Sequence, residues 1–230
     1  MCGRFTLRTP MSVLLEQFGI PLEPPWRPRY NIAPTQLVAA LRFAEAEDQR
    51  LASGWGLARL RWGLIPSWAK DPSIGSRMIN ARGETVHEKP SFRAAFRRRP
   101  CLILADGYYE WQARKGAKQP FHIRLASQGP MTFAGLWEHW KSGTDVIESC
   151  TIITTEANSL TRPIHDRMPV IIGPEDRSEW LSTETAVEQR LALIQPWDAA
   201  TMEAVPVSTH VNRPGNDDPS CLDEVSVEPD

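Results

Sequence analysis

The sequence has few cysteines for its length, and they are widely separated. The four cysteines of the 230-residue chain are Cys2, Cys101, Cys150 and Cys221. None forms a Cys-x-x-Cys pair, and no cysteine–histidine spacing is typical of zinc. This pattern predicts reduced thiols, no metal centre, and a reducing compartment such as the cytoplasm.

Long apolar runs and glycine-rich phosphate-binding motifs are also missing. No run approaches the roughly 18 apolar residues of a membrane-spanning helix, so we expect no membrane partner. Arg4 and Arg8 interrupt the region where a signal peptide would place its apolar stretch. Neither G-x-G-x-x-G nor G-x-x-x-x-G-K-[ST] occurs, and G-x-S-x-G is absent. We therefore expect no nucleotide cofactor and no other cofactor.

The formal net charge of −2 excludes a protein that coats nucleic acid by bulk charge, but it permits a local basic surface. Residues 77–99 hold seven basic side chains against two glutamates, a local charge of +5. This asymmetry favours phosphate contacts, whereas Arg97–Arg99 alone also fit a solvated face. Arg77 and Arg82 flank Asn80, whose amide stands in a short apolar stretch and needs hydrogen-bond partners there.

An apolar fraction of 41% is enough for a core, and 20 scattered prolines favour loops over long helices. Strands are expected at 37–43, 101–105, 121–125, 131–136 and 149–155, the third and fourth paired with each other. Helices are expected at 10–18 and 174–195. Strands outnumber helices and do not alternate with them, so the class is α+β with mostly antiparallel sheet. We expect one domain over residues 2–213. Residues 214–230 carry six acidic side chains and no lysine or arginine, which predicts a mostly disordered tail.

Cys2 is the first candidate for chemistry. Once Met1 is removed, its α-amine (pKa about 7.7–8.0) and thiol (about 8.5) stand on adjacent carbons. Such a group traps aldehydes, because the amine forms an imine and the thiol then closes a thiazolidine ring. The alternative is that position 2 only requires a small residue.

Glu110 and His165 are candidates for proton transfer. Glu110 lies between aromatic residues at the end of a predicted strand, where a raised pKa and general-acid work are plausible. The alternative is a surface carboxylate on a hairpin. His165 lies in a proline-bounded loop between Arg162 and Arg167, and its imidazole titrates in the useful range. The alternative is a hydrogen-bonded loop histidine. Trp26, Trp68 and Trp111 offer faces for stacking bases, or they pack in the core.

Six ordered segments together carry a family resemblance. They are Met1-Cys-Gly-Arg-Phe5, Arg29-Tyr-Asn-Ile-Ala-Pro-Thr35, Arg61-Trp-Gly-Leu-Ile-Pro66, Ile79-Asn-Ala-Arg82, Ala105-Asp-Gly-Tyr-Tyr-Glu-Trp111 and Ile164-His-Asp-Arg-Met-Pro169. This set closely resembles the SRAP (SOS-response-associated peptidase) family, whose members shield abasic sites in DNA. The match runs from residue 2 to about residue 212.

The resemblance implies a barrel-like core of antiparallel strands with a few peripheral helices. It also implies a monomer that binds single-stranded DNA with abasic sites, including single-strand/double-strand junctions, and links covalently to the ring-opened aldehyde. It would associate with the nucleoid when bound. The implied catalytic residues are Cys2, Asn80, Glu110 and His165. The implied DNA contacts are Arg4, Asn31, Trp68, Arg77, Arg82, Trp111, Arg162 and Arg167.

Two other functions use the same residues. Cys2 would also serve as the amino-terminal nucleophile of a cysteine peptidase, acting on its own Met1 or on other peptides. A third interpretation is a non-catalytic protein that binds DNA forks. Covalency separates them, because only a cross-link survives boiling in detergent.

Overall fold

A closed barrel forms the larger part of the fold. The computed structural model describes residues 2–18, 26–43 and 54–227. The barrel strands are β3 (Leu37–Phe43), β4 (Trp55–Trp62), β6 (Pro100–Ala105), β9 (Met131–Ser142) and β10 (Asp145–Glu156). The ring closes because β10 pairs with β4 on one side and β9 on the other. Two short strands, β5 (Asn80–Arg82) and β11 (Arg167–Pro169), also pair with β10.

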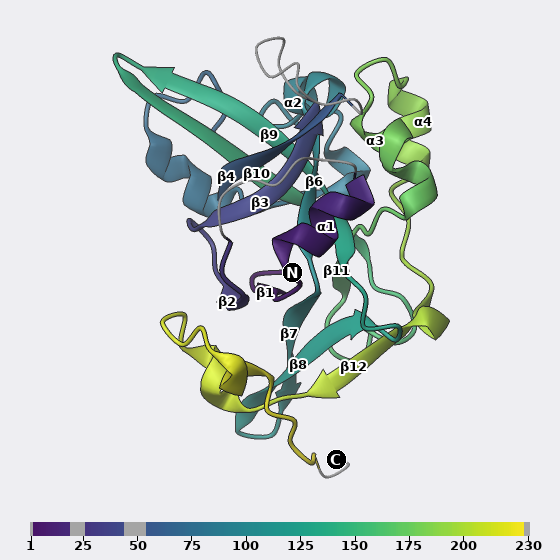
Figure 1. Ribbon diagram of the computed structural model, residues 1–230. Coiled ribbons are helices and arrows are strands. Elements are labelled where there is room, and N and C mark those ends of the chain that lie inside the picture. The colour runs from purple at the N-terminus through teal and green to yellow at the C-terminus, as the bar shows by residue number, and fades with distance from the viewer. Residues whose placement is uncertain (1, 19–25, 44–53, 228–230) are drawn as a thin grey trace.

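A second, smaller sheet lies below the barrel in the view of Figure 1. Its order is β12 (Met202–Pro206), β8 (Ala117–Leu125), β7 (Gly107–Arg114), β1 (Phe5–Leu7) and β2 (Arg29–Ile32). All of its pairings are antiparallel. The α+β class with a barrel-like core is therefore confirmed, with the pairings of β10 to β4 and β5 as the parallel exceptions.

The expected pairing of residues 121–125 with 131–136 is wrong. The first segment belongs to β8 in the smaller sheet and the second to β9 in the barrel. Lys115 and Gly116 form a two-residue connection between Arg114 and Ala117, and Gly116 has a φ of 84°. Such a turn joins neighbouring antiparallel strands directly, so it pairs β8 with β7 instead.

Helices surround the sheets. The α-helices are α1 (Met11–Phe18), α2 (Arg93–Arg98), α3 (Arg177–Leu181) and α4 (Val187–Ala192). The 3-10 helices are η2 (Pro72–Arg77), η3 (Gly83–Thr85), η4 (Pro174–Asp176), η5 (Ala199–Thr201), η6 (Thr209–Asn212) and η7 (Pro219–Leu222). Among the described residues, no helix is long and apolar enough to cross a bilayer.

The helix expected over residues 174–195 is divided into shorter pieces. Arg190 explains the division, because its buried guanidinium donates hydrogen bonds to the carbonyl oxygens of Trp180, Ser182 and Phe96. Two of these carbonyls end α3, so the same side chain satisfies the helix end and holds α4 against it.

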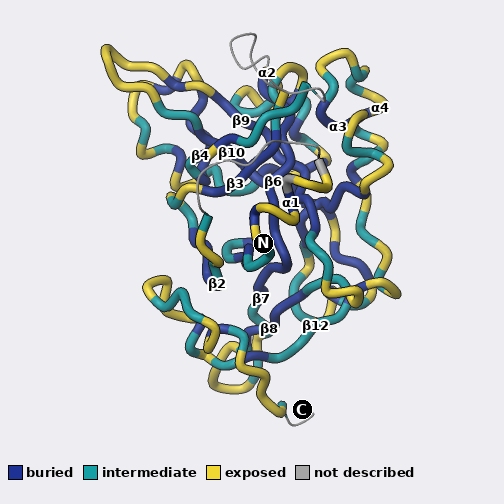
Figure 2. The backbone as a smooth tube through the Cα atoms, in the orientation of Figure 1, coloured by how far each residue is buried: buried dark blue, intermediate teal, exposed yellow. Residues whose placement is uncertain are grey.

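Phe5 fixes the position of the amino-terminal segment. Its ring packs edge-on against Trp62 (5.2 Å between centroids) and Phe133 (5.9 Å), both in the barrel. Burial of an aromatic ring at such a junction ties β1 to the barrel as well as to its own sheet. Strand β1 consequently lies between the barrel and the rest of the smaller sheet (Figure 1), and its three residues are buried (Figure 2).

The tail expected to be disordered is instead ordered over residues 214–227. Asp217 accepts hydrogen bonds from the backbone N–H groups of Tyr30 (2.6 Å) and Asn31 (2.9 Å) and pairs with the side chain of Arg29. Cys221 is fully buried in a small cluster with Tyr109 and other apolar residues. The acidic composition suggested a solvated segment. In the structure, the Asp217 carboxylate accepts hydrogen bonds from the open edge of β2, and the Cys221 thiol packs in a buried cluster.

Candidate functional site

The first residues of the chain run beside the strand that carries Glu110. Phe5 pairs with Tyr108, and the carbonyl oxygen of Arg4 accepts a hydrogen bond from the backbone N–H of Tyr109 (2.9 Å). Continued in the same antiparallel direction, this alignment sets Gly3 opposite Glu110. The local fold thus brings the amino-terminal cysteine to the carboxylate.

Asn80 holds the Cys2 backbone. Its Nδ2 donates a hydrogen bond to the Cys2 carbonyl oxygen (2.8 Å), and Cys2 itself is fully buried. Asn80 is placed by β5, which pairs with Ile152 of β10. The Asn80 Oδ1 atom is also buried and accepts no hydrogen bond within the described part of the chain. It is therefore an acceptor available to an amine or a ligand hydroxyl.

Burial sets the proton affinities of the site. It raises the pKa of the Cys2 thiol, and the charge of Glu110 raises that pKa further. Burial also raises the pKa of Glu110, an effect that His165 opposes. The buried Tyr108 has a pKa raised well above its ordinary value, first by burial and then by Cys2 and Glu110. The thiol is therefore neutral at rest, and Glu110 keeps its proton to a higher pH than an ordinary glutamate.

A pocket of about 500 Å³ opens beside Glu110. Its lining consists of Arg4, Glu110, Trp111, Lys118, His165 and Asn212. The Arg4 guanidinium lies 5.9 Å from the centre of the Trp111 ring, and Trp111 Nε1 donates to Asn212 Oδ1 (2.7 Å). The pocket thus joins two cations, an aromatic face and a buried acid, a combination that suits an anionic ligand with a planar or sugar-like part.

Nδ1 of His165 has one partner that donates to it and one that can accept from it. Its Nδ1 lies 3.0 Å from the backbone nitrogen of Arg167, whose N–H it accepts when the ring is neutral. The same Nδ1 lies 2.9 Å from the Asp166 carboxylate, which is its partner when the ring is protonated. A histidine with a partner for both states is suited to moving a proton.

Asn31 does not face the pocket. It is fully buried, and its Nδ2 donates to the carbonyl oxygens of Val211 (3.1 Å), Arg213 (3.1 Å) and Asn216 (2.7 Å). Its Oδ1 accepts a hydrogen bond from Arg4 (2.9 Å). The structure therefore connects Asn31 to the pocket through Arg4 and the segment 211–216, and not through direct exposure.

We expect Asn31→Ala to lower the free energy of unfolding by about 2–4 kcal/mol, because it removes the buried donor to three carbonyl oxygens and the acceptor of one Arg4 hydrogen bond. Urea titration followed by tryptophan fluorescence measures this change. Gln17→Ala, on the exposed face of α1, is the control and should shift stability by about 0.5 kcal/mol or less. Equal stability of the two variants would contradict a tethering role for Asn31.

Three of the arginines expected to contact DNA gather at one end of β10. Arg82 pairs in register with Thr154, and Arg167 pairs with Glu156. Arg162 is exposed and donates to the Ala157 carbonyl oxygen (3.0 Å). Arg167 is committed to a bidentate ion pair with Glu84 and to the Thr154 carbonyl oxygen. Arg82 and Arg162 are thus the more accessible cations of this group.

Trp68 and Arg77 lie elsewhere. Trp68 is 59% exposed, and its neighbour Ala69 accepts a hydrogen bond from Trp140. Trp140 pairs with Ile147 of β10, five residues from the position where Asn80 pairs. Five strand residues span about 17 Å. Arg77, exposed at the end of η2, belongs to the same segment. The structure does not bring these two residues to the pocket.

Sequence analysis did not identify three residues of the site, Lys118, Asn212 and Tyr108. Asn212 forms one wall and Lys118 another, while Tyr108 is buried beside Cys2 and Glu110. The Lys115-Gly116 pair in the sequence is typical of a hairpin turn. That turn places Lys118 on β8, the strand that pairs with the Glu110 strand β7. Asn212 had no such signal, because it reaches the pocket only through the Asn31 tether.

The family model described as SOS response associated peptidase (SRAP) matches residues 1–214. Abasic site processing protein YoqW of Bacillus subtilis (strain 168) is 44% identical over 229 residues, covering 97% of this chain and 99% of that protein. Abasic site processing protein HMCES of Pongo abelii is 33% identical over 277 residues, covering 99% and 77%.

A crystal structure of a protein from Bacteroides thetaiotaomicron superimposes with a TM-score of 0.86 at 23% identity, covering 98% of this chain and all of the other. That likeness concerns the fold alone. The family match and the identity to full-length relatives agree with the arrangement of the amino-terminal segment, β5 and β7 described above. The chain therefore belongs to the SRAP family.

Proposed function

We propose that this protein traps abasic sites in single-stranded DNA as a covalent thiazolidine at Cys2, once Met1 has been removed. One observation carries the proposal: Cys2 is held beside a buried acid, Glu110, and that acid lines a pocket together with cations and an aromatic ring. The names of the relatives, abasic site processing proteins, support the same class of lesion. Such a protein acts in the cytoplasm, as a monomer on the nucleoid during the response to DNA damage, and needs no cofactor.

The chemistry follows from the two groups on Cys2. The free amine attacks C1′ of the open-chain aldehyde, and loss of one water gives an imine. The thiol then adds across the C=N bond, its sulfur to carbon and its proton to nitrogen, and a five-membered ring closes. The neutral thiol that burial favours is the form that brings its own proton to this step. Holding both groups on one residue makes the second attack intramolecular.

Glu110, His165 and Asn80 have distinct roles in this scheme. A protonated Glu110 donates to the departing oxygen as water leaves, which its raised pKa favours. His165 assists opening of the sugar ring, and the Asp166 carboxylate beside Nδ1 is the group with which its ring can share a proton. The unoccupied Asn80 Oδ1 accepts a hydrogen from the Cys2 amine and aims its lone pair. Reversal of the same steps releases the DNA, a lyase-like activity.

The DNA is held by charge and stacking. Arg4 and Lys118 contact the phosphates that flank the lesion, and Trp111 stacks on a neighbouring base. Arg82 and Arg162 extend the basic surface beyond His165, where the strand or a junction continues. An abasic nucleotide has no base to unstack, so entry of its sugar into the pocket costs less than base flipping.

The experiment compares three single-stranded oligonucleotides that differ at one position: an abasic site, a borohydride-reduced abasic site, and thymidine. Protein with mature Cys2 should give a shifted band after boiling in detergent with the first only, because only it presents an aldehyde. A band with the reduced site as strong as with the aldehyde would exclude the proposed chemistry. Binding without any covalent band would favour the fork-binding interpretation.

We expect Trp111→Ala to weaken non-covalent binding of single-stranded DNA by about 5- to 160-fold, since loss of one base–aromatic stack costs about 1–3 kcal/mol. Fluorescence anisotropy with a reduced abasic oligonucleotide measures binding without the cross-link. Trp68→Ala is the matched variant, because Trp68 is more exposed and does not line the pocket, and it should cause the smaller loss. The reverse order would place the DNA path over η2 and not over the pocket.

The peptidase interpretation applies best to Met1 itself. Removal of Met1 is required here, and Glu110 and Asn80 lie beside the residue that follows the scissile bond. Against a general peptidase stands the raised pKa of the Cys2 thiol: an imine nitrogen can take the thiol proton as the sulfur attacks, whereas a peptide carbonyl offers no such base. We therefore propose autoproteolysis of Met1 as a maturation step and not as the main activity.

A further inference from the structure

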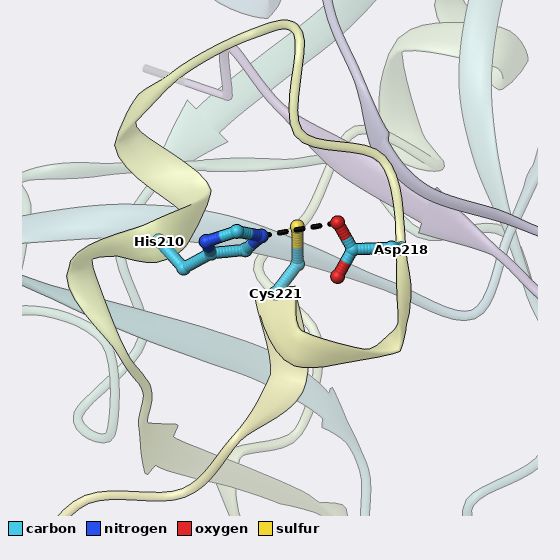
Figure 3. A group of neighbouring side chains, drawn as sticks. All are labelled: His210, Asp218 and Cys221. Carbon is cyan, nitrogen blue, oxygen red and sulfur yellow. Dashed lines mark hydrogen bonds and ion pairs between the residues drawn. The ribbon is translucent and has the colours of Figure 1, made fainter.

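We propose that His210, Asp218 and Cys221 form a zinc site in the carboxyl-terminal segment. The three side chains come from η6, η7 and the loop between them, and they point toward one another (Figure 3). Their ligand atoms all lie within 4.8 Å of one another. The sequence predicted no metal, because the spacing of these residues matches no common zinc motif; the fold brings them together.

The distances between the ligand atoms are near those that a bound zinc ion would require. His210 Nε2 lies 3.0 Å from Asp218 Oδ2, and the Cys221 sulfur lies 3.4 Å from the Asn216 carbonyl oxygen. Zinc bonds of 2.0–2.3 Å in a tetrahedron separate the ligand atoms by about 3.3–3.8 Å. Three protein ligands leave a fourth position for water or for the Asn216 carbonyl oxygen.

The donor set selects among metals. A thiolate, an imidazole and a single carboxylate oxygen suit Zn²⁺ or Co²⁺, whereas Mg²⁺ and Ca²⁺ require oxygen ligands. Asp218 is limited to one oxygen, because its Oδ1 accepts a hydrogen bond from the backbone N–H of Ser220 (2.9 Å). Binding at Nε2 places the His210 ring proton on Nδ1. Asn216 Nδ2 now lies 3.2 Å from Nδ1 and donates a hydrogen bond to the His210 carbonyl oxygen (2.8 Å), so the Asn216 amide must give up that bond to present its oxygen to Nδ1.

A metal ion at this site would affect the pocket through residues 210–221, because its ligands lie at both ends of that segment. Residues 210–221 include Asn212, a wall of the pocket, and Val211, whose carbonyl oxygen accepts a hydrogen bond from Arg4 (3.1 Å). Asn31 holds the same segment from the other side. An ion joining His210 to η7 would restrict this segment and hold Asn212 and Arg4 in the positions seen here.

The test uses Co²⁺ as the spectroscopic probe and a Cys2→Ala background, so that the amino-terminal aminothiol contributes no ligand. We expect one equivalent of Co²⁺ to give a thiolate-to-metal charge-transfer band that Zn²⁺ displaces. Cys221→Ser should lose the band, and His210→Ala and Asp218→Asn should each weaken binding by at least about tenfold. His139→Ala and Asp223→Asn, both exposed and outside the cluster, are the controls and should bind as the background protein does.

A second measurement does not depend on the variants folding. A hundredfold excess of free Zn²⁺ over its dissociation constant should raise the Tm of the Cys2→Ala protein by about 5–10 °C, and Mg²⁺ should not. Absence of saturable Co²⁺ binding overturns the proposal, as does a charge-transfer band that persists in Cys221→Ser. No readout involves DNA, so failure here leaves the cross-linking proposal unaffected, and the reverse also holds.

Discussion

Replacing Cys2 with alanine is expected to abolish the denaturant-resistant complex with abasic DNA completely. Alanine keeps an amino terminus that forms an imine, but an imine without a thiol hydrolyses during denaturation. The side chain is fully buried and close in size to the replacement, so the fold should survive with little change. A denaturing gel of the covalent complex and anisotropy of the non-covalent one separate chemistry from binding.

Cys2→Ser is the informative companion, because its hydroxyl closes only a less stable oxygen ring. A chain in which the Cys2 amine remains in a peptide bond should also fail, since it lacks the first nucleophile. Both should still bind a reduced abasic strand. A Cys2→Ala protein that cross-links like the wild type would move the chemistry to another residue, and a Cys2→Ser complex as durable as the wild type would exclude the thiazolidine.

Glu110→Gln is expected to slow cross-linking by about 10²- to 10⁴-fold at neutral pH, the usual contribution of a general acid. Glutamine has the shape of the protonated acid but cannot give up its proton, so DNA affinity should be retained. Single-turnover kinetics followed on denaturing gels measure the rate. Glu188→Gln, on the exposed face of α4, is the matched control and should react at the wild-type rate. A Glu110→Gln rate equal to the control would remove Glu110 from the mechanism.

The pH dependence gives a second readout for Glu110. Burial raises its pKa, so the wild-type rate should lose the acid's contribution as pH rises through a value above that of an ordinary glutamate. The folded state likewise loses stability as pH rises through that raised pKa, because a buried carboxylate must then be charged. Glu110→Gln should lack both dependences. A variant that keeps them would assign the titration to another group.

Local settings in the sequence made Cys2, Glu110 and His165 candidates with alternatives open, and the family resemblance implied the full set with Asn80. In the structure, two contacts bring three of these residues together. The antiparallel pairing of β1 with β7, continued to Gly3 opposite Glu110, brings the neighbouring Cys2 close to that carboxylate, and the amide of Asn80 reaches the Cys2 carbonyl from β5. Strand register follows from alternation and turns, both of which a sequence shows directly.

Contacts made through loops were not predictable in this way. Asn31 was expected at the DNA, yet its amide is used by three carbonyls of a segment about 180 residues later in the chain. The same segment includes Asp217, which accepts a hydrogen bond from the Asn31 backbone. It also includes Asn212, which lines the pocket. Such hydrogen bonds between distant loops leave no periodic pattern, and composition alone suggested solvation. The His210 cluster escaped detection for the same reason.

The intact mass of the cross-linked species, taken after denaturation and alkylation of free thiols, tests the central claim most directly. An imine and a thiazolidine have the same mass, but only the thiazolidine removes the Cys2 thiol from alkylation. We predict the mass of a chain without Met1 plus the abasic strand, less one water, with alkylation at Cys101, Cys150 and Cys221 only. A cross-linked chain that retains Met1, or one alkylated at Cys2 as well, would contradict the account.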